Sequence, residues 1–208
     1  MSYEAIAGEG VPSMVRVGDV IENPVTGEKM TFLRTGHETA GELLRIDMAV
    51  RPGGFVTGEH VHPHQEERFQ IASGEITLRM RGEERRYAAG EEITIPRGTP
   101  HAWWNSGADD LRVLLEFRPA GRFAEFITTF FALARTGKTN KRGLPMNPFQ
   151  LAATFSEYRD VIRGTTPPWG VQQILFAVLN PVGRLFGYRP DVPYVHEASA
   201  SRRRPNAA

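Results

Sequence analysis

Residues 54–74 read GFVTGEHVHPHQEERFQIASG, and this stretch decides how the rest of the chain is interpreted. His60 and His62 are two residues apart, so on a β-strand both imidazoles project from the same face. The alternation that follows places Glu67 on one face together with the apolar Phe69. Two imidazoles and a carboxylate that face one interior, without Lys or Arg among them, predict a divalent metal site.

A second stretch, residues 90–105, reads GEEITIPRGTPHAWWN and supplies a further candidate ligand. Pro96 and Gly98 are typical turn residues, and they separate one short strand from another that begins at His101. A third imidazole therefore lies on a neighbouring strand and can close the site from another side. Three imidazoles and one carboxylate suit Fe, Mn, Ni, Cu, Co or Zn, and such a ligand set discriminates poorly among these metals.

The two stretches match both signature motifs of the cupin superfamily. The first motif, G-x5-H-x-H-x4-E-x6-G, is filled at Gly54, His60, His62, Glu67 and Gly74. The second motif, G-x5-P-x-G-x2-H-x3-N, is filled at Gly90, Pro96, Gly98, His101 and Asn105. Residues 42–119 thus resemble a single cupin domain of the cupin-2 type. The resemblance implies a small β-barrel that holds one metal ion, with His60, His62, Glu67 and His101 as its ligands.

The pattern along the chain predicts a mainly β protein with a helical extension. About ten short alternating segments separated by turn residues indicate a closed β-sandwich or barrel, and jelly-roll closure agrees with the cupin double-stranded β-helix. Beyond Pro119 the apolar residues no longer alternate but recur three or four positions apart. We therefore expect helices over residues 122–135, 149–162 and 167–188. Pro181 is expected to kink or restart the third helix. We therefore divide the chain into a barrel with N-terminal strands at residues 1–118 and a helical extension with a basic tail at residues 119–208.

The composition narrows the class of protein. The 208 residues include no Cys, which excludes disulfides and thiolate ligands. No apolar stretch is long enough to span a bilayer and no signal peptide is visible at the N-terminus, so we expect a cytoplasmic protein. The net charge of +1 combines −6 in residues 1–118 with +7 in residues 119–208. Since no nucleic-acid motif accompanies the basic half, we expect no nucleic-acid partner.

The extension is expected to be structural. Its Phe- and Leu-rich helix faces should pack over the barrel or against a second subunit, which predicts a homodimer. The alternative is an apolar surface that rests on a membrane, with Trp169, Phe176, Leu185 and Phe186 inserted among the lipids. Residues 1–14 and the tail from about residue 191 are expected to be poorly ordered.

The expected barrel interior is mainly apolar beyond the ligands. Trp103 lies two residues after His101 and shares its inward face, so either substrate contact or plain core packing accounts for it. The further candidates for the pocket wall are Phe55, Phe69, Ile71 and Met48. An interior of this kind favours a small aromatic or otherwise hydrophobic ligand over a sugar phosphate, which would require inward-facing cations. His64 is interpreted as an outer-shell or surface residue and not as a ligand.

A metal ion with coordination positions left open by the protein indicates a catalytic site. Our first functional hypothesis is a metal-dependent oxidoreductase of the dioxygenase kind found among cupins with the same ligand set. The resemblance also implies that Glu67 can leave the metal and act as a general base. The alternatives are a metal-dependent lyase or isomerase, and a non-catalytic module that binds or senses a small molecule. Because the cupin fold hosts many unrelated activities, the fold alone does not choose among these.

Overall fold

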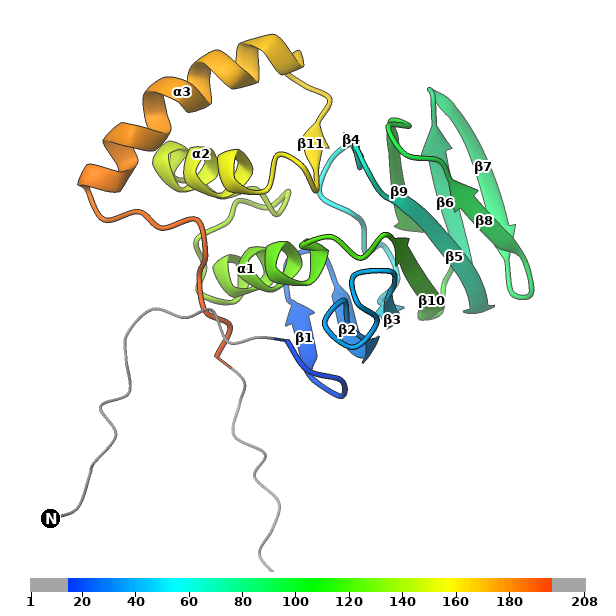
Figure 1. Ribbon diagram of the computed structural model, residues 1–208. Coiled ribbons are helices and arrows are strands. Elements are labelled where there is room, and N and C mark those ends of the chain that lie inside the picture. The colour runs from blue at the N-terminus through cyan, green and yellow to red at the C-terminus, as the bar shows by residue number, and fades with distance from the viewer. Residues whose placement is uncertain (1–14, 196–208) are drawn as a thin grey trace, which may run out of the picture.

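Two antiparallel sheets form the body of the protein, as the alternating segments predicted (Figure 1). The computed structural model describes residues 15–195, so the predicted arm at residues 1–14 and the tail from residue 196 lie outside the described residues. The first sheet runs in the order β1 (Val20–Asn23), β2 (Glu28–Arg34), β3 (Leu44–Val50), β10 (Leu111–Arg118), β5 (Glu66–Ser73) and β8 (Glu92–Ile95). The second runs in the order β11 (Arg163–Gly164), β4 (His60–Val61), β9 (His101–Asn105), β6 (Glu75–Met80) and β7 (Glu83–Ala88). This arrangement confirms the jelly-roll barrel.

The barrel core consists of the inward-facing residues of alternating strands. In β3 every second residue is buried, and these four residues are Leu44, Ile46, Met48 and Val50. Each fully buried side chain of this kind contributes about 1.5–3 kcal/mol relative to an exposed one. In the neighbouring strand β2 the same alternation turns Met30 and Phe32 inward together with a carboxyl group, that of Glu28.

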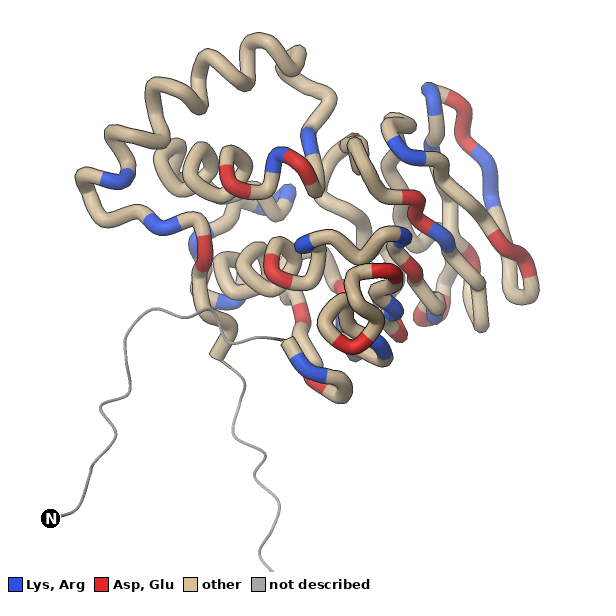
Figure 2. The backbone as a smooth tube through the Cα atoms, in the orientation of Figure 1, with Lys and Arg blue, Asp and Glu red and all other residues tan. Residues whose placement is uncertain are grey.

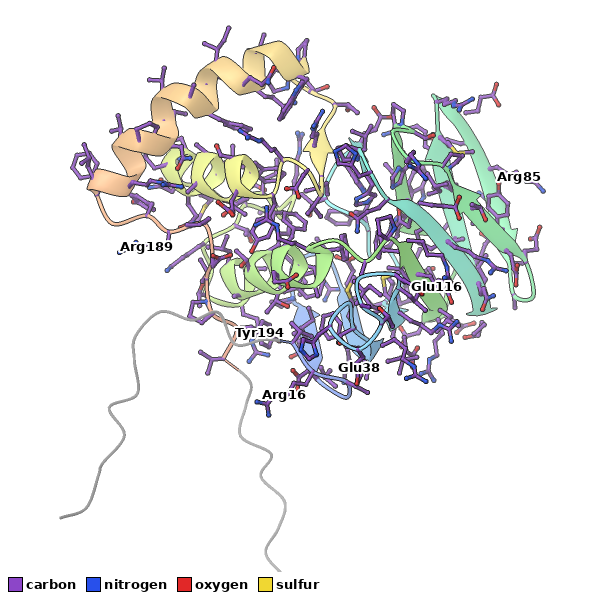
Figure 3. All side chains as sticks on the ribbon, in the orientation of Figure 1. Arg16, Glu38, Arg85, Glu116, Arg189 and Tyr194 are labelled. Atoms are coloured by element: carbon purple, nitrogen blue, oxygen red, sulfur yellow. The ribbon has the colours of Figure 1, made fainter. Side chains whose placement is uncertain are left out.

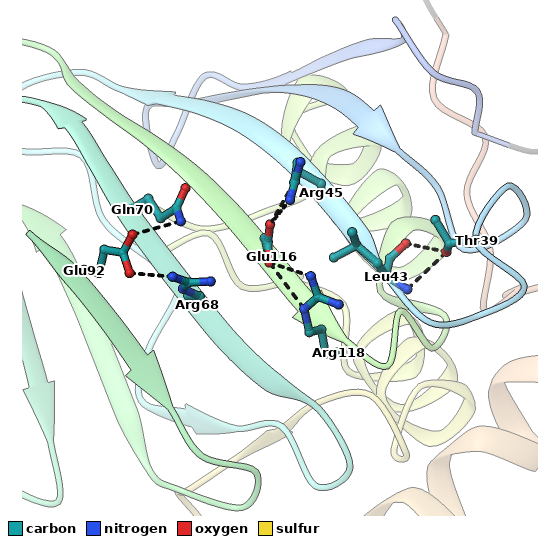
Figure 4. A network of polar contacts seen from close by, with 8 residues as sticks. All are labelled: Thr39, Leu43, Arg45, Arg68, Gln70, Glu92, Glu116 and Arg118. Atoms are coloured by element: carbon teal, nitrogen blue, oxygen red, sulfur yellow. Dashed lines mark hydrogen bonds and ion pairs between the residues drawn. The ribbon is translucent and has the colours of Figure 1, made fainter. Parts of the chain in front are cut away.

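The outer face of the first sheet carries ion pairs (Figure 4). Glu116 accepts a hydrogen bond of 2.7 Å from Nε of Arg45 and further bonds from Arg118. Arg45 therefore lies on the polar face of β3 and does not face the interior. Arg68 and Glu92 form a second, exposed pair that joins β5 to β8. Exposed pairs of this kind contribute little stability, so the packing of the core remains the main stabilising term.

Gly74 is one motif glycine whose role the structure explains. It has a φ of +82°, and a Cβ atom at this position would lie 2.8 Å from Cα of Leu111. A larger residue would meet both backbone strain and a backbone clash, so the turn between β5 and β6 requires glycine.

Three helices follow the barrel and stack to one side of it (Figure 1). Helix α1 (Phe123–Arg135) packs against β1 and buries an aromatic face that includes Phe126 and Phe130. Helices α2 (Pro148–Glu157) and α3 (Trp169–Leu185) pack against each other, and α3 is the outermost layer. The predicted second helix was too long: α2 ends at Glu157 because the chain then turns to form β11 against the barrel. Pro181 lies inside α3 and does not end it.

The outer side of α3 is apolar and exposed. Leu185 and Phe186 are 87% and 73% exposed, whereas Trp169 and Phe176 are half-buried. The charged residues lie mainly on the barrel, and α3 is nearly free of them (Figure 2). None of the helices in residues 15–195 is long and apolar enough to cross a membrane. The predicted homodimer and the membrane-surface alternative both remain predictions.

The last described residues return to the barrel. The hydroxyl of Tyr194 accepts a hydrogen bond of 2.9 Å from the backbone of Glu22 in β1, and Figure 3 shows this side chain at the base of the helical layer. Tyr158 donates a short hydrogen bond to Asp191. Residues 191–195 are therefore fixed by specific contacts, which the expectation of a poorly ordered tail from residue 191 did not foresee.

Candidate metal centre

Strands from both sheets position the four predicted ligands. His60 begins β4, Glu67 is the second residue of β5, and His101 begins β9. His60 and His101 are directly paired across the two strands, while His62 follows β4 by one residue. The predicted strand around the histidines is only two residues long, yet both imidazoles face the same interior. All four side chains are buried.

The four side chains converge on one point. One potential ligand atom from each of His60, His62, Glu67 and His101 lies within 4.8 Å of the others. Oε2 of Glu67 is 2.8 Å from Nε2 of His101 and 3.7 Å from Nε2 of His62. The imidazole rings of His60 and His101 have their centroids 4.3 Å apart. This clustering confirms that the four residues can share one cation.

The backbone orients each imidazole. Nδ1 lies within hydrogen-bond distance of a carbonyl oxygen in all three rings, and the partners are Gly58 for His60 (3.1 Å), Val161 for His62 (2.9 Å) and Thr99 for His101 (2.9 Å). A carbonyl oxygen only accepts, so Nδ1 carries the proton and the Nε2 lone pair is left for a metal. A metal-binding histidine usually donates a hydrogen bond from the ring nitrogen that does not bind the metal, and these three contacts are of that kind.

Burial keeps two of the histidines neutral. Burial lowers the pKa of His60 well below its ordinary value, and the neighbouring His101 and His62 lower it further. Burial also lowers the pKa of His62, although the Glu67 carboxylate opposes this effect. Burial acts in the same direction on His101, but the Glu67 carboxylate and the Thr99 carbonyl outweigh it and raise the pKa of His101. The Glu67 carboxylate beside Nε2 of His101 therefore favours the protonated form of this imidazole in the metal-free protein.

The unsatisfied atoms of the cluster fit a metal ion. Within residues 15–195, Oε2 of Glu67 and Nε2 of His101 are buried and form no well-directed hydrogen bond, although they lie close together. Buried polar atoms without a partner are costly, and a cation between them would satisfy both. The donor set of three imidazole nitrogens and one carboxylate oxygen suits a divalent transition metal without selecting one.

Comparison with known families agrees with this arrangement. The family model described as Cupin domain (Cupin_2) matches residues 46–117, which contain all four candidate ligands. Residues 46–117 form a cupin domain. The helices and the N-terminal hairpin lie outside the matched segment.

Two curated relatives resemble parts of the chain. A tetracenomycin polyketide synthase protein, TcmJ of Streptomyces glaucescens, is 35% identical over 81 residues, which cover 39% of this chain and 52% of the relative. The HTH-type transcriptional regulator PuuR of Escherichia coli is 28% identical over 106 residues, which cover 51% of this chain and 56% of the relative. The chain therefore spans about half the length of the curated relatives it matches.

Among solved structures, a predicted oxalate decarboxylase from Thermotoga maritima aligns with a TM-score of 0.45 and 24% identity. The alignment covers 51% of this chain and 98% of that chain.

Three of the four candidate ligands line a large apolar cavity. Its volume is about 760 Å³, and His60, His62 and Glu67 form part of its wall. Aromatic side chains of α1 and α2 form much of the remainder, among them Phe123, Phe126, Phe130 and Phe155. Helix α3 closes the outer side. The cavity thus lies between the cupin domain and the helical extension.

The structure divides the predicted pocket residues into two groups. Trp103 and Phe55 line the cavity. Met48, Phe69 and Ile71 are buried in the barrel core and are not among the lining residues. His64 is exposed, which agrees with its interpretation as a surface residue.

Sequence reasoning missed two groups of cavity residues. Glu28 faces the cavity from β2. The alternation that it shares with Met30 could have indicated its inward position. The phenylalanines of α1 were recognised as a helix face, but nothing in their spacing indicated that this face would cover a metal site.

The helical extension is tied to the ligand strand. Strand β11 pairs with β4, so that Gly164 lies opposite His60. Thr165 donates its amide proton to the carbonyl of Glu59, and Val161 supplies the carbonyl that orients His62. The division at residue 118 remains a prediction, but these contacts show that the extension helps to position the candidate ligands.

We expect the Gln172→Ala substitution to loosen this junction. The Gln172 amide donates hydrogen bonds to the carbonyls of Gly164 (2.8 Å) and Pro167 (2.6 Å) and is buried. Its loss leaves two carbonyls without these donors and should destabilise the protein by about 1–3 kcal/mol. Hydrogen exchange should accelerate first at the Thr165 amide. Substitution of the neighbouring, exposed Gln173 by Ala is the matched control and should change neither quantity. Unchanged exchange at Thr165 in the Gln172 variant would contradict this role.

Proposed function

We propose that the protein is a metal-dependent oxidoreductase, dioxygenase-like, that acts on a small and mainly apolar or aromatic organic molecule. One observation carries the proposal: a buried cluster of three histidines and one carboxylate lies beside an apolar cavity of about 760 Å³, and His60, His62 and Glu67 form part of the cavity wall. A ligand that fills such a cavity is recognised mainly by the burial of its own apolar surface.

In this proposal the four candidate ligands, His60, His62, Glu67 and His101, hold one divalent transition metal ion. When bound, the metal would supply Lewis acidity or redox chemistry at the inner end of the cavity. The chain itself binds and orients the substrate between the barrel and α1. Trp103 and Phe55 supply apolar contacts from the barrel side. Apolar walls also exclude water, which strengthens every electrostatic interaction inside.

Glu67 is the residue that we assign as catalytic. It is buried, and its Oε2 atom has no well-directed hydrogen bond within the described residues. A carboxylate in this position can accept a proton from a substrate held against the histidines.

The names of the two curated relatives support different uses of the domain, one in a polyketide synthase and one in a transcriptional regulator. The resemblance to a transcriptional regulator favours, as the second candidate function, a non-catalytic module that senses a small molecule.

The decisive experiment measures oxygen uptake and product formation by the metal-loaded protein against a panel of phenols and aromatic ketones. We expect oxygen uptake that depends on one class of compound and is lost in Glu67→Gln, with each rate normalised to the metal content of the same protein because Glu67 is also a candidate ligand. Conversion of a compound without oxygen uptake would replace this proposal by a lyase or isomerase. Tight binding without any conversion would replace it by the sensing module.

A further inference from the structure

The cavity contains a second carboxyl group that the cupin motifs do not include. Glu28 lies at the start of β2, in the N-terminal hairpin outside the matched family segment. The alternation of β2 turns it inward beside Met30, and both residues line the cavity. The side chain is only 5% exposed, so the cavity is the space into which it opens.

The surroundings of Glu28 do not favour a charged carboxylate. No described Lys, Arg or His forms an ion pair with it, in contrast to Glu116, which pairs with two arginines. Within residues 15–195 its one side-chain hydrogen bond comes from the Thr26 hydroxyl, which donates to Oε2 over 2.6 Å. A buried carboxylate with a single neutral donor is costly, so burial shifts the equilibrium toward the neutral acid.

The electrostatics of the cavity act in the same direction. Burial raises the pKa of Glu28 to about 7, the Thr26 hydrogen bond opposes the rise, and the negative charge of Glu67 adds to it. The other charged or titratable groups that line the cavity are Glu59, His60, His62, Arg79 and Arg142. A neutral carboxyl group carries one O–H donor, and the Thr26 hydroxyl already uses its own proton on Oε2. The acid proton is therefore available to a molecule inside the cavity.

We propose that Glu28 is a ligand-recognition residue, which donates a hydrogen bond from its neutral carboxyl group to a carbonyl or hydroxyl oxygen of an otherwise apolar ligand. This inference rests on the proposed function, because it assumes that an apolar molecule occupies the cavity. It adds a selectivity rule: among molecules of similar size and shape, those with an acceptor oxygen bind preferentially. Aromatic ketones and phenols satisfy this rule, and the corresponding hydrocarbons do not.

The test uses two probes of nearly equal shape, 2-acetylnaphthalene and 2-ethylnaphthalene, which differ in the presence of a carbonyl oxygen. Equilibrium dialysis gives the Kd of each probe for the wild-type protein and for Glu28→Gln and Glu28→Met. We expect the ratio of the ketone Kd to the hydrocarbon Kd to rise about tenfold in Glu28→Met, which has no donor. The ratio should stay within about twofold of wild type in Glu28→Gln, whose amide still donates.

The matched control is Glu59→Met, because Glu59 also lines the cavity but its carboxylate already accepts a hydrogen bond from Thr165. This variant should keep the wild-type ratio. Metal content, measured for each protein, shows that the centre is intact. Binding of both probes with one ratio in all variants would overturn the role of Glu28 and leave the proposed function standing. Failure of the wild-type protein to bind either probe would overturn both.

Discussion

The His101→Ala protein is expected to retain less than about a tenth of the wild-type metal content after dialysis against a weak chelator. The substitution removes one of four donors and leaves Oε2 of Glu67 without the imidazole that now lies 2.8 Å away. Loss of an outer hydrogen-bond partner of a metal ligand already lowers affinity by about 10–100-fold, so loss of a ligand should exceed that range. Metal analysis by mass spectrometry gives the stoichiometry directly.

The matched control for this variant is His64→Ala. His64 lies in the same stretch as His60 and His62, but its side chain is exposed and outside the cluster. Its removal should leave the metal content unchanged. Circular dichroism should report the wild-type fold in both variants, since the barrel core does not include these side chains. Wild-type metal content in His101→Ala would show that His101 is not a ligand.

The second large effect concerns the pH dependence of stability in the metal-free protein. Below about pH 4.5 Glu28 is protonated in both the folded and the unfolded chain. Between pH 4.5 and about 7 the unfolded chain releases this proton while the folded protein retains it, so stability falls as pH rises. The loss is complete above pH 7 and amounts to about 3 kcal/mol for a shift of this size.

Glu28→Gln should remove this loss. The variant is therefore expected to be more stable than the wild-type protein at pH 8, by about 3 kcal/mol more than at pH 4.5. Urea unfolding of the two metal-free proteins across this range gives the difference. Subtraction of the two curves cancels the titration of Glu67 and of the histidines, which both proteins share. Parallel curves would show that Glu28 titrates at its ordinary value in the folded protein.

The cluster of candidate metal ligands was predictable from sequence because its geometry is local. The alternation of a strand predicted that His60 and His62 face the same interior, although only His60 lies within β4, and the turn at Pro96 and Gly98 brings His101 onto the adjacent strand. The barrel was predictable for the same reason, since alternation and turn residues are signals of short range.

The cavity was not predictable, because it depends on how distant elements dock. The spacing of Phe123, Phe126 and Phe130 defines a helix face, but a helix face can cover a core, an interface or a site. The pocket residues predicted from the sequence were all inward-facing positions of the barrel. Of those, Trp103 and Phe55 reach the cavity, whereas Met48 lies deeper in the core.

The contribution of the extension to the ligands was also hidden in the sequence. Val161 orients His62 through a backbone carbonyl, which any residue type could supply. The predicted helix over residues 149–162 missed this contact, since the chain leaves the helix after Glu157 and pairs with β4. The pairing of β11 with β4 outweighed the helical spacing of the apolar residues in this segment.

The proposed metal centre requires that His60, His62, Glu67 and His101 hold one cation together. Anomalous diffraction from crystals of the metal-loaded protein, recorded at the absorption edge of the bound metal, tests it most directly. We expect a single strong peak at roughly 2.0–2.2 Å from Nε2 of His60, His62 and His101 and from a carboxylate oxygen of Glu67. A metal-loaded protein whose anomalous peak lies elsewhere, or touches fewer than three of these residues, would contradict it.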